Sequence, residues 1–398
     1  MALDDNDFLG SIAQENVIFN TQVVKTTSVG DNFWKVMVFL ENTRYIDSTD
    51  TAWVAVPGLT GVKALTVTAD DYASYTSGVL QSWLYDLFVN GFTGDCILVA
   101  ISDNIDGTSI TAADFITAMD SAYEILKPYA YFKTVLAGEP GDNYSTLPAV
   151  AVELASLCAV DKGLLSAAPL YPCISTNPAE EDDTSKPDSP VVKGDAVYKA
   201  LNAANKDAFM VYAEDVTRNA ALYSLGLALS VTNGSGTSVG NQFDFVASSG
   251  MSASGTSGLN PTSAMKTIWE SLNIGYFKTV GDNSGNVAQV GAETLQGDTY
   301  AATWIIAYIA YMSKVSIAQL MTARNFYRNE SNYERILNVL AGILNKFSER
   351  LKNIFITAPK FSEIAESSDE IIIPNAWEAT YIDVIRKVTI TGTLYIGG

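Results

Sequence analysis

The sequence predicts an α/β fold, α+β overall, in which a mixed sheet core of βαβ units precedes a domain of long helices. Between Asp95 and Ser230, short apolar segments alternate with segments of helical periodicity. Such alternation is typical of a mainly parallel sheet with helices packed on its faces. After Gly258 the segments become longer and mostly helical. This change predicts a second domain.

The α/β part is predicted from the period of its apolar residues. Strands are expected at residues 16–24, 33–40, 96–101, 130–137, 164–170, 208–213 and 243–246, and helices at residues 70–88, 111–126, 146–159, 193–205 and 217–230. Segment 33–40 (FWKVMVFL) is nearly all apolar, which predicts a strand buried on both faces. Residues 175–190 are proline-rich and acidic, which predicts an exposed insertion.

The C-terminal part is expected to contain long helices and short strands. Helices are predicted at residues 263–272, 300–321 and 333–353, and strands at residues 274–280, 370–373 and 387–396. The predicted organisation is an N-terminal arm (1–30), an α/β domain (31–258), an inner domain of helices and strands (259–370) and a C-terminal strand arm (371–398).

Two segments near the ends of the sequence read as strands with one apolar face. In residues 387–396 (KVTITGTLYI) the apolar face consists of Val388, Ile390, Leu394 and Ile396; in residues 16–24 (NVIFNTQVV) it includes Val17, Phe19 and Val23. A terminal strand must pair either within its own chain or with another molecule. Pairing with another molecule would make the protein a building block of an assembly.

Composition and charge exclude several classes of function. The chain has 398 residues, no histidine and a net charge of −20. Without histidine, Ser-His-Asp, Cys-His and HExxH chemistry cannot operate. The negative charge argues against nucleic acid as the main partner. We expect no secretory signal, no membrane insertion and no metal or cofactor site, and we expect Cys96, Cys158 and Cys173 to be reduced core thiols.

One segment is basic. Residues 314–360 contain eight basic and three acidic residues, so they carry +5 while the rest of the chain carries −25. Arg335, Lys346 and Arg350 are expected to cluster on one face of the helix predicted at 333–353. This face is either an ordinary solvated surface or a basic surface that docks an acidic partner.

Five stretches, in this order, resemble the contractile tail sheath proteins of bacteriophages and related contractile injection systems. They are Val23–Leu40 (VVKTTSVGDNFWKVMVFL), Ala149–Ala168 (AVAVELASLCAVDKGLLSAA), Asp207–Leu229 (DAFMVYAEDVTRNAALYSLGLAL), Asn273–Thr279 (NIGYFKT) and Ile336–Ile356 with the terminal strands. The order of the elements and the chain length carry the likeness. The insertion at 175–190 has no counterpart in the family pattern.

The resemblance implies a structural subunit that polymerises as stacked hexameric rings around a tail tube. Sheath subunits add terminal strands to sheets of their neighbours, and contraction drives the tube through the target cell envelope for genome ejection or a related injection. Implied partners are copies of the chain, the tail tube protein, the baseplate and the tail terminator. No cofactor, nucleic-acid contact or catalysis is implied, and Arg335, Lys346 and Arg350 would face the tube. The implied location is the virion tail, assembled in the host cytoplasm.

Two other functions stay open at this point. The chain could be a different self-assembling virion or surface-layer component, such as a tail tube, baseplate or capsid-associated protein. It could also be an α/β enzyme that uses a pair of carboxylates, although no loop motif at the strand ends supports such a site.

Overall fold

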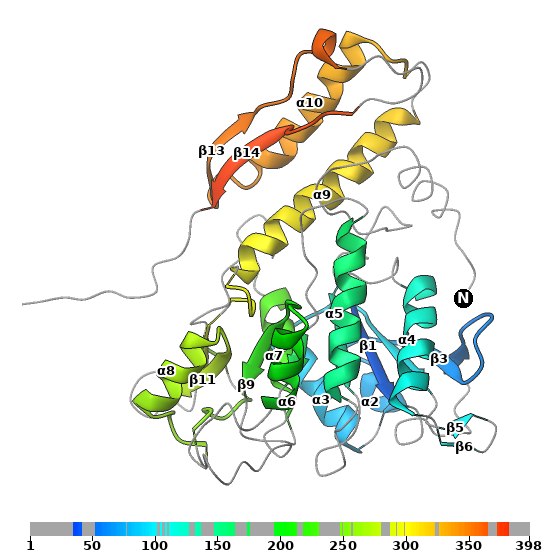
Figure 1. Ribbon diagram of the computed structural model, residues 1–398, viewed down its shortest axis with the longest axis vertical. Helices are drawn as coiled ribbons and strands as arrows, with labels where there is room; N and C mark the ends of the chain where they lie inside the picture. The colour runs from blue at the N-terminus through cyan, green and yellow to red at the C-terminus, as the bar shows by residue number, and fades with distance from the viewer. Residues whose placement is uncertain are drawn as a thin grey trace, which may run out of the picture.

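The computed structural model describes most of the chain (Figure 1). The described residues are 35–41, 52–76, 78–101, 104–105, 108–109, 111–126, 132–136, 147–163, 173–175, 195–212, 218–230, 247–248, 250–255, 258–279, 287–291, 293–297, 299–322, 326–364 and 372–381.

A ten-stranded mixed sheet forms the body of the protein, in the order β10-β12-β11-β9-β8-β7-β1-β4-β3-β2. Its strands are β1 Val36–Glu41, β2 Val54–Ala55, β3 Val62–Val67, β4 Cys96–Ile101, β7 Phe132–Leu136, β8 Cys173–Ser175, β9 Phe209–Tyr212, β10 Ala247–Ser248, β11 Gly275–Thr279 and β12 Val287–Val290. The six central strands, β11-β9-β8-β7-β1-β4, run parallel to one another, while β2, β3, β10 and β12 pair antiparallel at the two sides. This arrangement confirms the predicted α/β fold.

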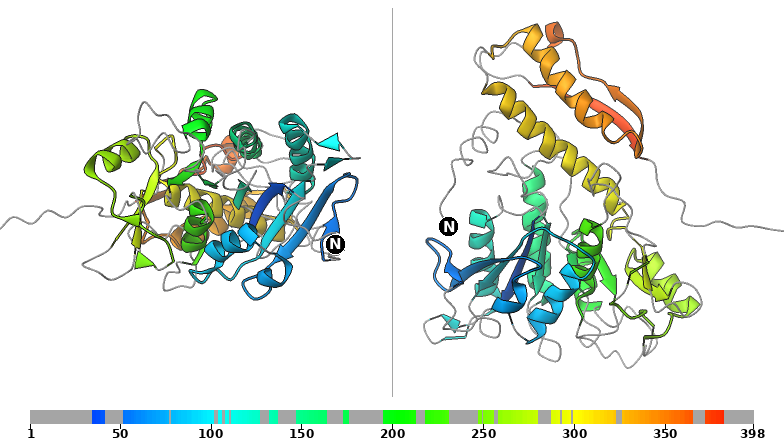
Figure 2. Two further views of the ribbon diagram at one scale, coloured as in Figure 1. Left: turned by 90° about the horizontal axis from the view of Figure 1, so that it is seen from below. Right: turned by 180° about the vertical axis from the view of Figure 1, so that it is seen from behind.

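Helices cover both faces of the sheet. They are α2 Tyr72–Tyr75, α3 Gly78–Phe88, α4 Ala112–Leu126, α5 Leu147–Gly163, α6 Asp195–Ala203, α7 Ala220–Ser230 and α8 Ser263–Ser271. Helix α3 packs against α7, while α5 packs against α4 and α6. Viewed from below, the sheet lies between these two helical layers (Figure 2). The central strand β1 is therefore buried on both faces, with residues 36–40 fully inaccessible to solvent.

Helices α3 and α7 meet at a contact that tolerates only glycine. Gly226 of α7 lies so close to the backbone of α3 that a Cβ at this position would be 2.0 Å from the Leu87 carbonyl oxygen. At the start of α7, the fully buried Asp86 of α3 accepts hydrogen bonds from the Arg218 guanidinium and from the Asn219 amide (2.6 Å). The carboxylate thus lies at the positive end of α7, where the helix dipole favours a negative charge.

A C-terminal unit projects from the body on one long helix (Figures 1 and 2). Helix α9 (Tyr300–Met321) leads to α10 (Glu330–Asn345), and α10 is followed by a hairpin of β13 (Leu351–Ile356) and β14 (Trp377–Tyr381). A 3₁₀ turn, η5 (Phe361–Glu363), lies between the two strands in sequence. We call α10 together with the hairpin the C-terminal unit. A second small hairpin joins β5 (Asn104–Ile105) and β6 (Thr108–Ser109) in the body.

The strand predicted at 96–101 and the helix predicted at 300–321 are confirmed to the residue. The other described helices and strands that were predicted within the body are present with bounds shifted by at most four residues, except that the helix predicted at 70–88 is interrupted between α2 and α3. The strands of the body that were not predicted are β2, β3, β5, β6, β8, β10 and β12. The strands predicted at 16–24, 164–170, 243–246 and 387–396, and residues 176–190 of the insertion, lie outside the described residues.

Three predictions about the C-terminal half need correction. Helix α10 ends at Asn345, so the helix predicted at 333–353 is wrong beyond that residue, and β13 takes its place. Residues 372–373 form no strand. The domain boundary predicted after residue 258 does not fall at the end of the sheet, because β11 pairs with β9 and β12 pairs with β11. The body therefore extends at least to Val290.

The α3–α7 contact gives a direct test of the packing. A Gly226→Ala variant should be destabilised by about 1–3 kcal/mol or more, since its methyl group would meet a backbone atom that cannot move alone. A Gly342→Ala variant in α10 is the matched control: no atom lies within 4 Å of its new Cβ, so it should gain about 0.5–1 kcal/mol of helix stability. Urea unfolding measures both, and equal stability of the two variants would contradict the described contact.

Candidate assembly interface

The hairpin of β13 and β14 is a two-stranded sheet with open edges. The strands pair antiparallel, with Leu351 opposite Tyr381 and Ile356 opposite Trp377. A bulge between Lys352 and Phe355 bends β13, and Asn353 within it takes a positive φ of 50°. Among the described residues, no third strand pairs with either edge. Unpaired backbone donors and acceptors along such an edge can accept a strand from another segment.

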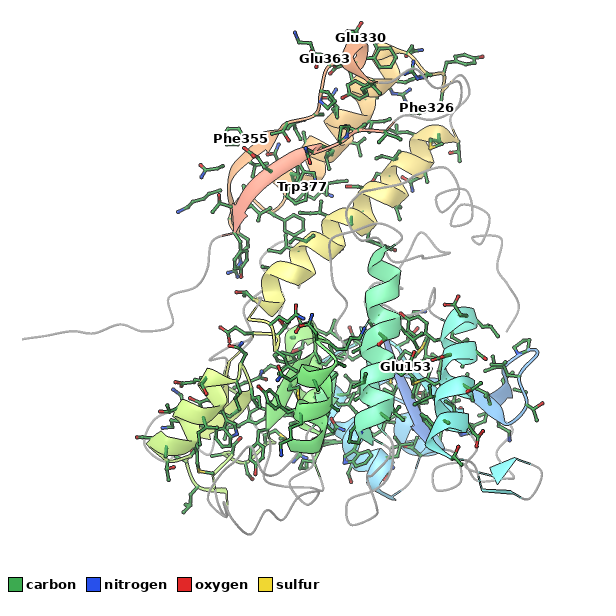
Figure 3. All side chains as sticks on the ribbon, in the orientation of Figure 1. Glu153, Phe326, Glu330, Phe355, Glu363 and Trp377 are labelled. Carbon is green, nitrogen blue, oxygen red and sulfur yellow. The ribbon has the colours of Figure 1, made fainter. Side chains whose placement is uncertain are left out.

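One face of the hairpin rests on α10. Leu351 is buried, and Ile354, Trp377, Ala379 and Tyr381 pack as partly buried side chains against the core that contains Leu340, Ile343, Leu344 and Phe347. In Figure 3, Trp377 lies between the hairpin and α9, and Phe355 lies on the opposite side. An isolated pair of strands is marginally stable in water, so the hairpin depends on this helix for its shape.

The other face of the hairpin is exposed. It carries Lys352, Phe355, Glu378 and Thr380, and Phe355 keeps 53% of its surface accessible to solvent. The sheet thus has one apolar and one mainly polar face. A third strand that alternates apolar and polar residues could pair with this sheet, with its apolar side chains on the apolar face and its polar side chains on the polar face.

Helix α10 is fixed at its start and along its apolar side. The Asn329 side chain caps the helix by accepting a hydrogen bond from the Asn332 amide (2.9 Å). Tyr333 donates a hydrogen bond to the Pro359 carbonyl, which ties α10 to the segment after β13. Ile336 packs with Ile317 of α9, and the ring of Phe347 meets that of Tyr308 edge to face. The C-terminal unit is therefore docked along α9 by side chains from both helices.

The three predicted basic residues do not share one helical face. Arg335 is exposed on α10, where it donates a hydrogen bond to Asn332 (3.0 Å) and lies over the Phe326 ring. Lys346 is the C-cap of α10, and Arg350 lies in the turn that enters β13. Lys346 and Arg350 are thus near the negative end of the α10 dipole, where a positive charge stabilises a helix. A role for these residues at a tube surface stays a prediction.

The predicted arm residues Val17, Phe19, Val23, Val388, Ile390, Leu394 and Ile396 lie outside the described residues. What the sequence reasoning missed is the hairpin that such arms could extend. Its signals were present in the sequence: residues 354–357 (IFIT) are β-branched or aromatic, and in residues 377–381 (WEATY) the polar Glu378 and Thr380 alternate with apolar or aromatic residues.

No group of three or more His, Cys, Asp or Glu residues suited to hold a metal occurs in the described part of the chain. Cys96 and Cys158 are buried in the core, as predicted, and burial raises the pKa of the Cys96 thiol. The side chain of Cys173 is not among those described. None of the described helices is long and apolar enough to cross a membrane.

Comparison with known proteins finds a similar fold among solved structures. No family model and no curated protein sequence matches this chain. Among solved structures, the fold matches a chain in the cryo-EM structure of the anti-feeding prophage baseplate, which was symmetrised six-fold. The match covers 93% of this chain and 95% of that chain, with 13% sequence identity and a TM-score of 0.58. The two chains therefore share a fold that includes both the body and the C-terminal unit.

The packing of the hairpin on α10 can be tested by one pair of variants. Leu344 is fully buried and Phe355 is half exposed. Leu344→Ala should cost about 2–5 kcal/mol of stability and should speed amide hydrogen exchange in β13 and β14. Phe355→Ala should change stability by less than about 0.5 kcal/mol, because its side chain faces solvent. If amide hydrogen exchange in the hairpin of a folded Leu344→Ala variant is as slow as in the unchanged protein, the hairpin does not depend on α10.

Proposed function

We propose that this protein is a sheath subunit of a contractile tail or related injection particle, with a structural rather than a catalytic role. The observation that carries the proposal is the fold match to a baseplate chain, which extends over nearly the full length of both chains. Sheath-like order of elements in the sequence supports the same conclusion. In this function the subunits form hexameric rings stacked around a tube, and ring contraction moves the tube.

The open hairpin supplies what such an assembly needs. In this proposal the segment 387–396 of one subunit pairs with an open edge of the β13–β14 hairpin of a neighbour. Val388, Ile390, Leu394 and Ile396 would extend the apolar layer over α10, and the threonines between them would extend the exposed face. Each added strand forms a row of main-chain hydrogen bonds, so subunits stay connected while their side-chain contacts change.

A baseplate component is the second candidate, because the matching solved structure is a baseplate. The two functions differ in the size of the assembly. Electron microscopy of the purified protein separates them: long tubes of repeating rings indicate a sheath, whereas single rings or wedges indicate a baseplate component. Monomers at all concentrations, with or without a tail tube, would contradict both.

The arm can be tested by truncation. Deleting residues 389–398 should leave a folded, soluble monomer that does not polymerise, since the hairpin of the neighbour would lose its added strand. A double variant, Ile390→Lys with Ile396→Lys, should fail in the same way. The matched control, Thr391→Lys with Thr393→Lys, changes the opposite face of the strand and should still assemble. Ordered tubes of the truncated protein, seen by electron microscopy, would rule out the arm.

The basic residues can be tested by charge reversal. A triple variant with Arg335, Lys346 and Arg350 changed to Glu should no longer assemble on tubes, because it would repel an acidic tube surface. The control changes Lys199, Lys206 and Lys266 of the body to Glu, which alters the net charge equally. Thermal unfolding must accompany the assay, since Lys346 lies at the end of α10 and its reversal should itself cost about 0.3–1 kcal/mol. Normal assembly of the triple variant would exclude a tube-facing role.

A further inference from the structure

The start of α9 is held by polar side chains that lie where strands β9 and β11 of the sheet begin. Strands β9 and β11 run parallel, with Gly275 opposite Val211, so both strands begin at the same edge. Asp207 precedes β9 and Asn273 precedes β11. Both side chains reach the turn of residues 293–297, which joins β12 to α9.

Asp207 is the centre of this contact. Asp207 is 7% exposed, and its carboxylate accepts hydrogen bonds from the Thr294 hydroxyl (3.0 Å), the Gln296 amide (3.1 Å) and the Ala208 amide (2.9 Å). The Leu295 amide also donates to the Ala208 carbonyl (2.9 Å). The turn is thus bound to the start of β9 through both a side chain and the main chain.

Asn273 holds the same turn from the other side. Its Nδ2 donates to the Leu295 carbonyl oxygen (3.2 Å), and its positive φ of 56° is one that asparagine tolerates better than most residues. The turn itself closes at Gly297, whose φ of 88° favours glycine. At the base of α9, the N-cap Thr299 makes no side-chain hydrogen bond to the helix. The orientation of the helix start therefore depends on contacts made before the helix begins.

Apolar contacts alone would not fix the direction of α9. Ile305 and Ile309 are buried and hold the helix near the body, but hydrophobic attraction has no preferred direction. Hydrogen bonds do have one. A helix of 22 residues spans about 33 Å, so a change of about 10° at its root moves its far end by about 6 Å.

We propose that Asp207, Asn273 and Thr294 form a clamp that sets the direction of α9, and with it the position of the C-terminal unit relative to the sheet. The clamp makes the body and the C-terminal unit a single rigid piece. This inference goes beyond the proposed function and does not require it. Asp207, Asn273 and Thr294 are positioning residues in this proposal, and none of them is expected to touch a partner.

The clamp can be tested by spin-label distances in the full-length protein. Labels at Thr117→Cys in α4 and Asn338→Cys in α10 report the position of the C-terminal unit, since both sites are exposed. Labels at Thr117→Cys and Lys199→Cys report the body alone. The background carries Cys173→Ser, and the remaining native thiols are buried. Dilution with unlabelled protein removes distances between subunits, so any assembly of the chain does not affect the result.

Asp207→Asn and Thr294→Val should each shift and broaden the distance between α4 and α10 and leave the distance within the body unchanged. The control Asp114→Asn removes an exposed carboxylate that accepts hydrogen bonds from Thr111, far from the turn in sequence, and should change neither distance. If folded Asp207→Asn and Thr294→Val both keep the original distribution, the clamp is excluded. Should Asp207→Asn fail to fold, Thr294→Val decides alone, because it removes a single hydroxyl donor.

Discussion

The whole fold depends on one strand that is enclosed on all sides. Strand β1 pairs in parallel with β4 on one side and β7 on the other, and residues 36–40 are inaccessible on both faces. Without β1 the ten-stranded sheet would separate into two parts. Its five apolar side chains are buried within the body and its backbone pairs with β4 and β7, so β1 has no free surface for a partner.

The hairpin of the C-terminal unit is the opposite case. Its two strands are covered on one face by α10, and no third strand among the described residues pairs with either edge. An open edge is usually a liability, because it invites uncontrolled association. In an assembly built by strand addition the same edge becomes the connecting site. The contrast between the enclosed strand β1 and the open edges of the hairpin therefore separates a part of the subunit that gives rigidity from a part suited to connection.

The sequence predicted the body better than the C-terminal unit, for physical reasons. Residues 96–101 are apolar throughout, and a strand buried on both faces needs no particular phase, so β4 was located to the residue. Strand β3 was missed because its buried residues, Val62, Leu65 and Val67, do not alternate regularly with exposed ones. The boundary at residue 258 was misplaced because the pairing of β11 with β9 joins segments far apart in sequence. Local periodicity carries no information on such a pairing.

The misassigned helix at 346–353 explains why the candidate interface was found only in part. Phe347 and Leu351 continue the apolar spacing of α10, so periodicity alone extends the helix through them. In the fold, Phe347 remains part of the core beneath the hairpin, and Leu351 enters it as the first residue of β13. The same two side chains thus fill the core whether the segment is helical or extended. The β-branched and aromatic residues at 354–357 favour the strand. The basic residues keep their sequence positions but lose their common face, because a turn replaces the last two turns of the predicted helix. What remains is a unit whose strand edges, rather than a charged helix, are its most distinctive surface.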